Sequence, residues 1–380
     1  DKRYNLTSNL TVKATKTTTI KLGVQGYLAN VNYPGTGLGT VFGDAFVKTP
    51  VVYPAVYSDG STPDVASSRL SNPYAELTRT GYINQWRSEL NSNLRVTQNL
   101  DFWLKGLSFT AMFAFDTYNY TSMHRTKVPD TYLAIGRDSS GALIKQLTNP
   151  GMGTEYLAYS LVRDGTRTLY NEAALNYRNS FGKHDVSAML LFNQSDEVNT
   201  QASSLVLSLP FRFRGLAGRA TYGYNNKYFL EFDFGYNGSE NFAPSNRYGF
   251  FPSVGAGWVV SEEPFFKPLQ NAIQLLKFRF SYGLVGNSQI VSDNTVRFAY
   301  IGTVDNTSGY TFGESLDNAY GGLDIGEYGV DVTWETAKKA NLGIDIDALN
   351  GRLHLTADAF NEHRTGIFLR RASLPAYVGV

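Results

Sequence analysis

The chain has 380 residues, with 34 Lys and Arg, 33 Asp and Glu, and no Cys. The formal net charge of +1 provides no bulk attraction for nucleic acid, so we expect no nucleic-acid partner. The lack of Cys excludes a disulfide framework and thiolate metal sites. Aromatic residues make up 14% and charged residues only 18% of the chain, a balance that excludes a disordered protein.

The apolar residues are not gathered into long runs. The longest, such as residues 111–115, fall far short of the ~18–20 residues of a membrane-spanning helix. The first residues contain no Met and no signal-peptide pattern. We therefore expect a mature piece or an internal fragment of a longer chain.

Apolar and polar residues alternate with a period of two along most of the chain. From Tyr4 to Ala14 the even positions are mostly apolar, whereas the odd positions from Asn5 to Lys13 are polar. Several alternating segments exceed the ~5–6 residues usual for strands of soluble proteins. A short helical turn is predicted within 262–276. The alternation predicts twelve strands, near 3–14, 18–31, 84–97, 106–119, 166–178, 185–199, 214–225, 227–237, 250–261, 275–285, 334–348 and 352–366.

Short and long connections alternate between these strands. In an antiparallel meander this arrangement puts every short turn at one end of the sheet and every long loop at the other. Outer-membrane β-barrels have this asymmetry, with short periplasmic turns and long extracellular loops. The long connections are predicted near 32–83, 120–165, 200–213, 238–249 and 286–333.

Aromatic residues near the strand ends, such as Tyr222, Tyr228 and Phe250, suit the two interfaces of a bilayer. Every backbone group must be paired in lipid, so long strands imply a closed barrel. A soluble β-sandwich, solenoid or propeller would also show alternation. Propeller strands are short and their blades repeat, however, and the sequence contains no repeat unit beyond the hairpin.

A motif rich in aromatic residues, Gly and Pro lies between Tyr228 and Glu263. Its residues include Asn241, Phe242, Pro244, Arg247, Gly249, Phe250, Pro252 and Trp258. Together with residues 278–287 and 334–345, this motif resembles a signature of SusC/RagA-type TonB-dependent transporters. That resemblance implies an all-β fold, a transmembrane antiparallel β-barrel of about 22 strands filled by an N-terminal plug.

On this resemblance, residues 1–380 are expected to be part of a single transmembrane barrel domain, without the plug and the C-terminal strands. A free-standing barrel of twelve strands remains an alternative interpretation, because twelve is an even number within the known range. The resemblance implies TonB-dependent import of nutrient oligosaccharides or peptides across the outer membrane, together with a SusD-like surface lipoprotein. TonB would act through the N-terminal part. A passive porin embedded in outer-membrane lipid is the alternative.

The sequence contains no evident catalytic constellation, so we expect neither an enzyme nor a cofactor. Glu362 and His363 have no second ligand at metal spacing, and no metal site is expected. Asp345 and Asp347 fall on the same polar face. A solvated barrel wall is a simpler interpretation of that pair than acid–base catalysis.

Candidate substrate contacts lie in the long connection near 286–333. Aromatic rings beside amide and carboxylate groups suit glycans or peptides, although the same rings could pack the loops on one another. The candidates are Tyr300, Tyr310, Phe312 and Tyr320.

The motif residues are interpreted as structural, locking a loop for barrel assembly. Arg247 is predicted to pair with Glu240 or with Asp233. Trp258 is predicted to face lipid or an interfacial girdle rather than to serve as a sugar platform.

Overall fold

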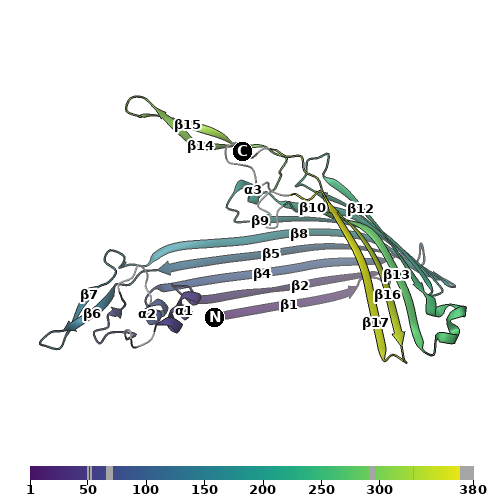
Figure 1. Ribbon diagram of the computed structural model, residues 1–380, viewed down its shortest axis with the longest axis horizontal. Coiled ribbons are helices and arrows are strands. Elements are labelled where there is room, and N and C mark those ends of the chain that lie inside the picture. Colours follow the sequence, from purple (N-terminus) through teal and green to yellow (C-terminus); the bar gives the residue numbers. More distant parts are fainter. Residues whose placement is uncertain (49–50, 52–53, 66–71, 291–296, 328, 369–380) are drawn as a thin grey trace.

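The computed structural model describes the chain except for residues 49–50, 52–53, 66–71, 291–296, 328 and 369–380. Twelve antiparallel strands form one open, curved sheet (Figure 1), which confirms the predicted number of long strands. Most strands extend a few residues beyond the predicted bounds. They are β1 (Lys2–Lys13), β2 (Thr18–Pro34), β4 (Gly81–Asn99), β5 (Leu107–Thr126), β8 (Ala158–Phe181), β9 (His184–Asn199), β10 (Phe211–Tyr224), β11 (Tyr228–Ser239), β12 (Tyr248–Val259), β13 (Ile273–Asn287), β16 (Glu335–Ala348) and β17 (Leu353–Thr365).

The pairing registers give the sheet two chemically different faces. Leu230 on β11 pairs with Tyr222 and Ala256, whereas the next residue, Glu231, pairs with Thr221 and Gly255. Apolar side chains therefore line up across strands on one face, and polar side chains on the other. The apolar face stays open to the surroundings of the chain.

The turns and the loops leave opposite ends of the sheet as predicted, but their lengths do not alternate strictly, because the connection 240–247 is shorter than the turn 260–272. Residues 14–17, 100–106, 182–183, 225–227 and 349–352 form short turns, and residues 260–272 form a modest one. Asn225 and Asn226 adopt positive φ angles of 50° and 56°, the conformation that closes a tight hairpin. The long connections, 35–80, 127–157, 200–210, 240–247 and 288–334, leave the opposite ends of the strands (Figure 1).

The structure confirms a short helical turn within 262–276, because the 3₁₀ segment η2 (Pro264–Leu269) lies there. A second 3₁₀ segment, η1 (Val260–Glu262), directly precedes that range. From Ile273 the chain is extended and pairs with β16. Pairing to a neighbouring strand outweighs the weak helical spacing of the apolar residues there.

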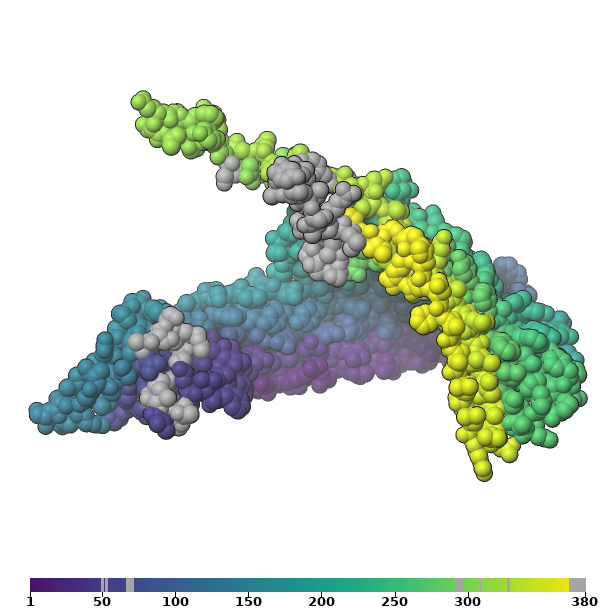
Figure 2. Space-filling view, in the orientation of Figure 1, coloured from purple at the N-terminus to yellow at the C-terminus, as the bar shows by residue number. Residues whose placement is uncertain are grey.

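The long connections contain regular elements that the sequence pattern does not reveal. Strands β3 (Thr62–Pro63), β6 (Thr131–Arg137) and β7 (Leu143–Leu147) form a small second sheet. Strands β14 (Thr303–Phe312) and β15 (Asn318–Glu327) form a hairpin that projects from the molecule (Figure 2). The helices are α1 (Leu38–Val47), α2 (Pro73–Thr78) and α3 (Leu205–Ser208).

The first two long connections fold against each other. Asn72, which is 1% exposed, accepts hydrogen bonds from the N–H groups of Tyr74 and Ala75 and so caps α2. Its amide also donates to the carbonyl oxygen of Pro63 at 2.8 Å. The Lys145 ammonium of β7 contacts the Asp59 carboxylate, which joins the two connections.

None of the helices in the described residues combines the length and apolar character that a membrane crossing requires.

Candidate functional site

Ion pairs cross the polar face of the large sheet. Arg219 on β10 lies 2.6 Å from Glu231 on β11, and Arg279 on β13 lies 2.8 Å from Asp345 on β16. Arg279 also reaches Asp358 on β17 at 3.3 Å. Because these groups are partly exposed, each pair contributes only about 0–1 kcal/mol. The polar face is a solvated, charge-balanced wall. This agrees with the interpretation of Asp345 as part of such a wall rather than as a catalytic group.

A hollow of about 810 Å³ lies on this face toward the short turns. Gly223, Gly255 and Gly257 form part of its floor. A Cβ atom at any of them would meet its nearest neighbour at 3.5–3.6 Å, an ordinary contact. Packing of the sheet therefore does not require glycine at these three positions. Because the glycines have no side chains, they leave space above the sheet for the hollow. Its charged lining residues are Arg178, Asp185, Arg219, Glu231, Lys277 and Arg279.

The motif residue Phe242 lies in an aromatic cluster at the long-loop end. It is 2% exposed, and its ring centroid lies 5.2 Å from that of Trp334. Phe251 meets the same Trp334 ring edge-on at 5.2 Å. A Cβ atom at Gly249 would collide with the Phe251 ring, so a larger residue there would displace that ring. The cluster holds the connections 240–247 and 288–334 together.

Other motif residues occupy varied positions. The Asn241 amide donates to the carbonyl oxygen of Ser288 at 3.1 Å, and Pro244 is exposed within its connection. Phe250 is on the apolar face, 5.8 Å from the Phe234 ring. Pro252 lies just beyond Ser253, where pairing with β13 stops, so that edge of the strand needs no N–H donor from Pro252.

The predicted partners of Arg247 are wrong. Glu240 pairs with Arg297 at 2.5 Å, and Asp233 lies 3.6 Å from Arg219. The Nε atom of Arg247 is buried and has no hydrogen-bond partner among the described residues. Arg247 and Glu240 are close in sequence, which suggested the pairing, but Glu240 instead forms its ion pair with Arg297 from a distant connection.

Trp258 lies on the apolar face beside the short turns, and it is 39% exposed. Its Nε1–H donates to Glu263 at 3.3 Å, and the hydroxyl of Tyr228 donates to the same carboxylate at 2.5 Å. Lys227 pairs with Glu263 at 3.2 Å. These contacts lower the pKa of Glu263 below its ordinary value, and the hydrogen bond from Tyr228 is the largest cause. Aromatic rings with a tethered polar end suit a membrane interface.

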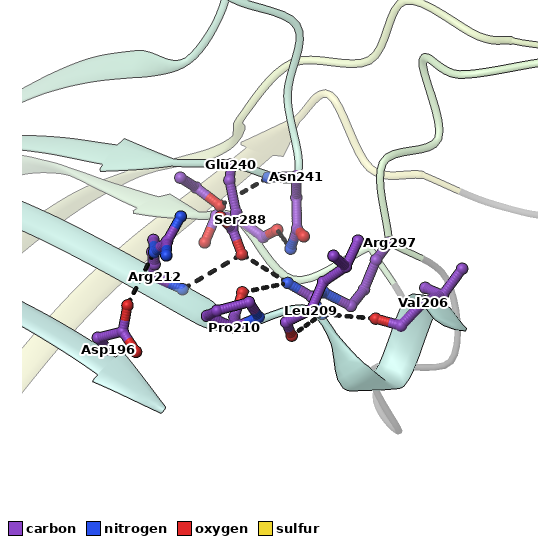
Figure 3. Close-up of polar contacts among 10 residues, drawn as sticks. Asp196, Val206, Leu209, Pro210, Arg212, Glu240, Asn241, Ser288 and Arg297 are labelled. Carbon is purple, nitrogen blue, oxygen red and sulfur yellow. Dashed lines mark hydrogen bonds and ion pairs between the residues drawn. The ribbon is translucent and has the colours of Figure 1, made fainter. Parts of the chain in front are cut away.

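Arg297 is a residue that the sequence analysis missed. Its side chain is 1% exposed, and it donates to the carbonyl oxygens of Val206, Leu209 and Pro210 at 2.8–2.9 Å (Figure 3). With its ion pair to Glu240, Arg297 joins three long connections: 200–210, 240–247 and 288–334. No local spacing signals such a contact, because the partners lie 57 to 91 positions away.

The structure brings three of the four candidate aromatic residues together. Tyr310 and Phe312 on β14 have ring centroids 4.9 Å apart, and Tyr320 on β15 lies 5.5 Å from Phe312. Their exposed fractions are 54–68%. Tyr300 lies outside this hairpin and meets the ring of Phe298 edge-on at 6.4 Å. The projecting hairpin thus presents a cluster of accessible rings.

A metal site is not indicated in the part of the chain that the structure describes, since no three His, Asp or Glu residues converge there.

Known proteins resemble the chain in sequence and in fold. No family model matches it. The TonB-dependent receptor P3 of Formosa agariphila is 27% identical over 401 aligned positions, which cover 100% of this chain and 38% of the relative. The TonB-dependent receptor SusC of Bacteroides thetaiotaomicron is 34% identical over 139 positions, 36% of this chain and 13% of the relative.

The fold is similar to that of a solved transporter. A structure of the RagAB peptide importer in the closed-closed state matches with a TM-score of 0.67 and 19% identity, over 100% of this chain and 42% of the other. The chain therefore spans about two fifths of the length of P3 and of the RagAB chain.

The two-faced antiparallel sheet, with its unequal ends, has the fold of part of a transmembrane β-barrel. In sequence the chain is similar to proteins named TonB-dependent receptors, SusC among them, in agreement with the resemblance that the motif around Phe242 predicts. The relatives are named as receptors and importers, not as enzymes.

Proposed function

We propose that this chain is barrel wall and outer loops of a TonB-dependent importer, which carries nutrient oligosaccharides or peptides across the outer membrane. The main support is the relationship to TonB-dependent receptor P3 along the whole chain. A polar inner wall with ion pairs and hollows also suits passage of a polar nutrient. Import here is ligand-biased gating rather than bond chemistry.

The proposed domain is a single barrel to which residues 1–380 contribute twelve strands, within a longer protein that also has a plug. A SusD-like lipoprotein is the proposed outer partner, and TonB the inner one. The accessible rings of Tyr310, Phe312 and Tyr320 are proposed contacts for nutrient or lid. Tyr300 is a less direct candidate, because it packs against Phe298.

Energised uptake by cells tests the proposal. A strain carrying the full-length gene is compared with a strain in which the TonB-interacting segment is deleted, and uptake of labelled oligosaccharides and peptides is measured. We expect the deletion to abolish uptake while the barrel still reaches the outer membrane. A passive porin would instead give the same uptake in both strains, limited only by solute size and charge.

A further inference from the structure

Two adjacent rows of side chains meet on the polar face near the long-loop end. In one row Phe211 on β10 pairs with Glu197 on β9. In the next row Phe213 on β10 lies between Ser195 on β9 and Ser239 on β11. The two phenyl rings therefore lie on the same face, two positions apart, with a carboxylate and two hydroxyl groups beside them.

A hollow of about 210 Å³ stands over these rows. Its wall is completed by Glu240, Asn241 and Ser288 from the long connections. Specific sites for whole small ligands usually occupy ~300–1,000 Å³, so this hollow fits a single unit of a longer ligand.

Arg297 positions the wall of the hollow. It fixes Glu240, which also accepts a hydrogen bond from the backbone N–H of Arg212 at 3.2 Å (Figure 3). The Arg297 guanidinium lies over the ring of Phe211, 3.8 Å from its centroid. One face of Phe211 is thus covered, while Phe213 is 36% exposed on the polar side.

Two of the three carboxylates at the hollow are held in ion pairs. Arg297 neutralises Glu240, and Arg212 pairs with Asp196 at 2.8 Å. Glu197 has no ion pair within the described residues and can accept hydrogen bonds. Hydroxyl and amide groups supply further donors and acceptors. An unpaired carboxylate beside an exposed phenyl ring suits a ligand that donates hydroxyl groups along its edge and has an apolar face, as a saccharide ring does.

We propose that this hollow is a subsite for one saccharide ring of an imported oligosaccharide. Phe213 contacts the apolar face of the ring, and Glu197 accepts hydrogen bonds from its hydroxyl groups. Ser195, Ser239 and Asn241 complete the polar contacts. The inference rests on the proposed import function and narrows its substrate to neutral glycans.

Binding by the purified full-length protein tests the subsite. An array of neutral oligosaccharides and a matched set of lysine-containing peptides are screened, and the affinity of the best glycan is measured by calorimetry. Glu197→Gln and Phe213→Ala should each weaken glycan binding about tenfold, the loss of one charged hydrogen bond or one ring contact. Phe213→Tyr, which keeps the ring, should retain most of the affinity.

Phe360→Ala is the matched control, because Phe360 is an exposed ring on the polar face of β17, outside the hollow. Its glycan affinity should equal that of the wild type. The proposal is overturned if no neutral glycan binds, if only the peptides bind, or if Glu197→Gln and Phe213→Ala bind glycan normally. Uptake that still requires the TonB segment in those variants would leave the import function standing while the subsite fails.

Discussion

At the scale of single residues, one carboxylate organises the short-turn end of β11 and β12. Glu263 accepts hydrogen bonds from Tyr228 and Trp258 and pairs with Lys227. The two rings are thereby held at the border of the apolar face by their polar ends. Side chains with an apolar body and a polar tip anchor a barrel at the interface of the bilayer.

Glu263→Gln should lower the thermal stability of the barrel at pH 7, because the charge-assisted hydrogen bonds are lost. The folded protein holds the Glu263 pKa below its ordinary 4.5, so its contribution is present above pH 4.5 and disappears as the pH falls through the folded pKa. Heat-modifiability gels from pH 7 to pH 3 should show the two proteins converging in acid. A gap that is constant over the whole range would contradict this role.

At the scale of elements, side chains along each long strand alternate between the apolar face and the polar face of the sheet. On β16, Leu342 is 57% exposed on the apolar face and pairs with Phe280. Its neighbour Asn341 faces the polar side beside Ser281. The period of two therefore reflects two different environments, hydrocarbon on one face and water on the other, rather than a protein core.

Leu342→Arg should destabilise the barrel in lipid vesicles by about 2–4 kcal/mol, because it places a charge in the hydrocarbon region. Asn341→Arg, one residue earlier, is the matched control and should change the unfolding free energy little. Denaturant titration of the refolded full-length protein measures both. Equal destabilisation by the two variants would mean that lipid does not contact the apolar face.

At the scale of the whole molecule, the long connections are joined to one another rather than hanging separately from the strands. Arg297 connects residues 200–210 with 240–247, and the Phe242–Trp334 contact connects 240–247 with 288–334. The projecting hairpin β14–β15 starts at Thr303, shortly after Arg297. Its base is consequently anchored to the rim of the sheet.

Arg297→Met should free the rim, because breaking a buried ion pair costs about 3–5 kcal/mol when one charge is left unpaired. Hydrogen exchange should accelerate in residues 200–210 and 240–247, while strands β1 to β5 keep their protection. Arg212→Met, which removes an exposed pair with Asp196, is the control and should have little effect. If hydrogen exchange in these residues were unchanged in Arg297→Met, the proposed anchoring role of Arg297 would be wrong.

The sequence by itself determined the twelve long strands, their two faces and the positions of the connections between them. Each of these follows from local information: side chains alternate along an extended chain, and turn residues such as Asn225 and Asn226 close hairpins between neighbouring strands. The motif around Phe242 indicated the class of protein that the chain resembles, and its residue spacing is also local information.

Only the tertiary structure decided how the long connections meet. Sequence reasoning paired Arg247 with Glu240 or Asp233, but in the folded chain Glu240 pairs with Arg297 and Asp233 lies near Arg219. The hairpin β14–β15 and the small sheet of β3, β6 and β7 were not predicted. These contacts join residues far apart in the chain, and no period or spacing records which of many polar groups will meet. They depend on the pairing of the strands, which places the connections 200–210, 240–247 and 288–334 next to one another at one end of the sheet.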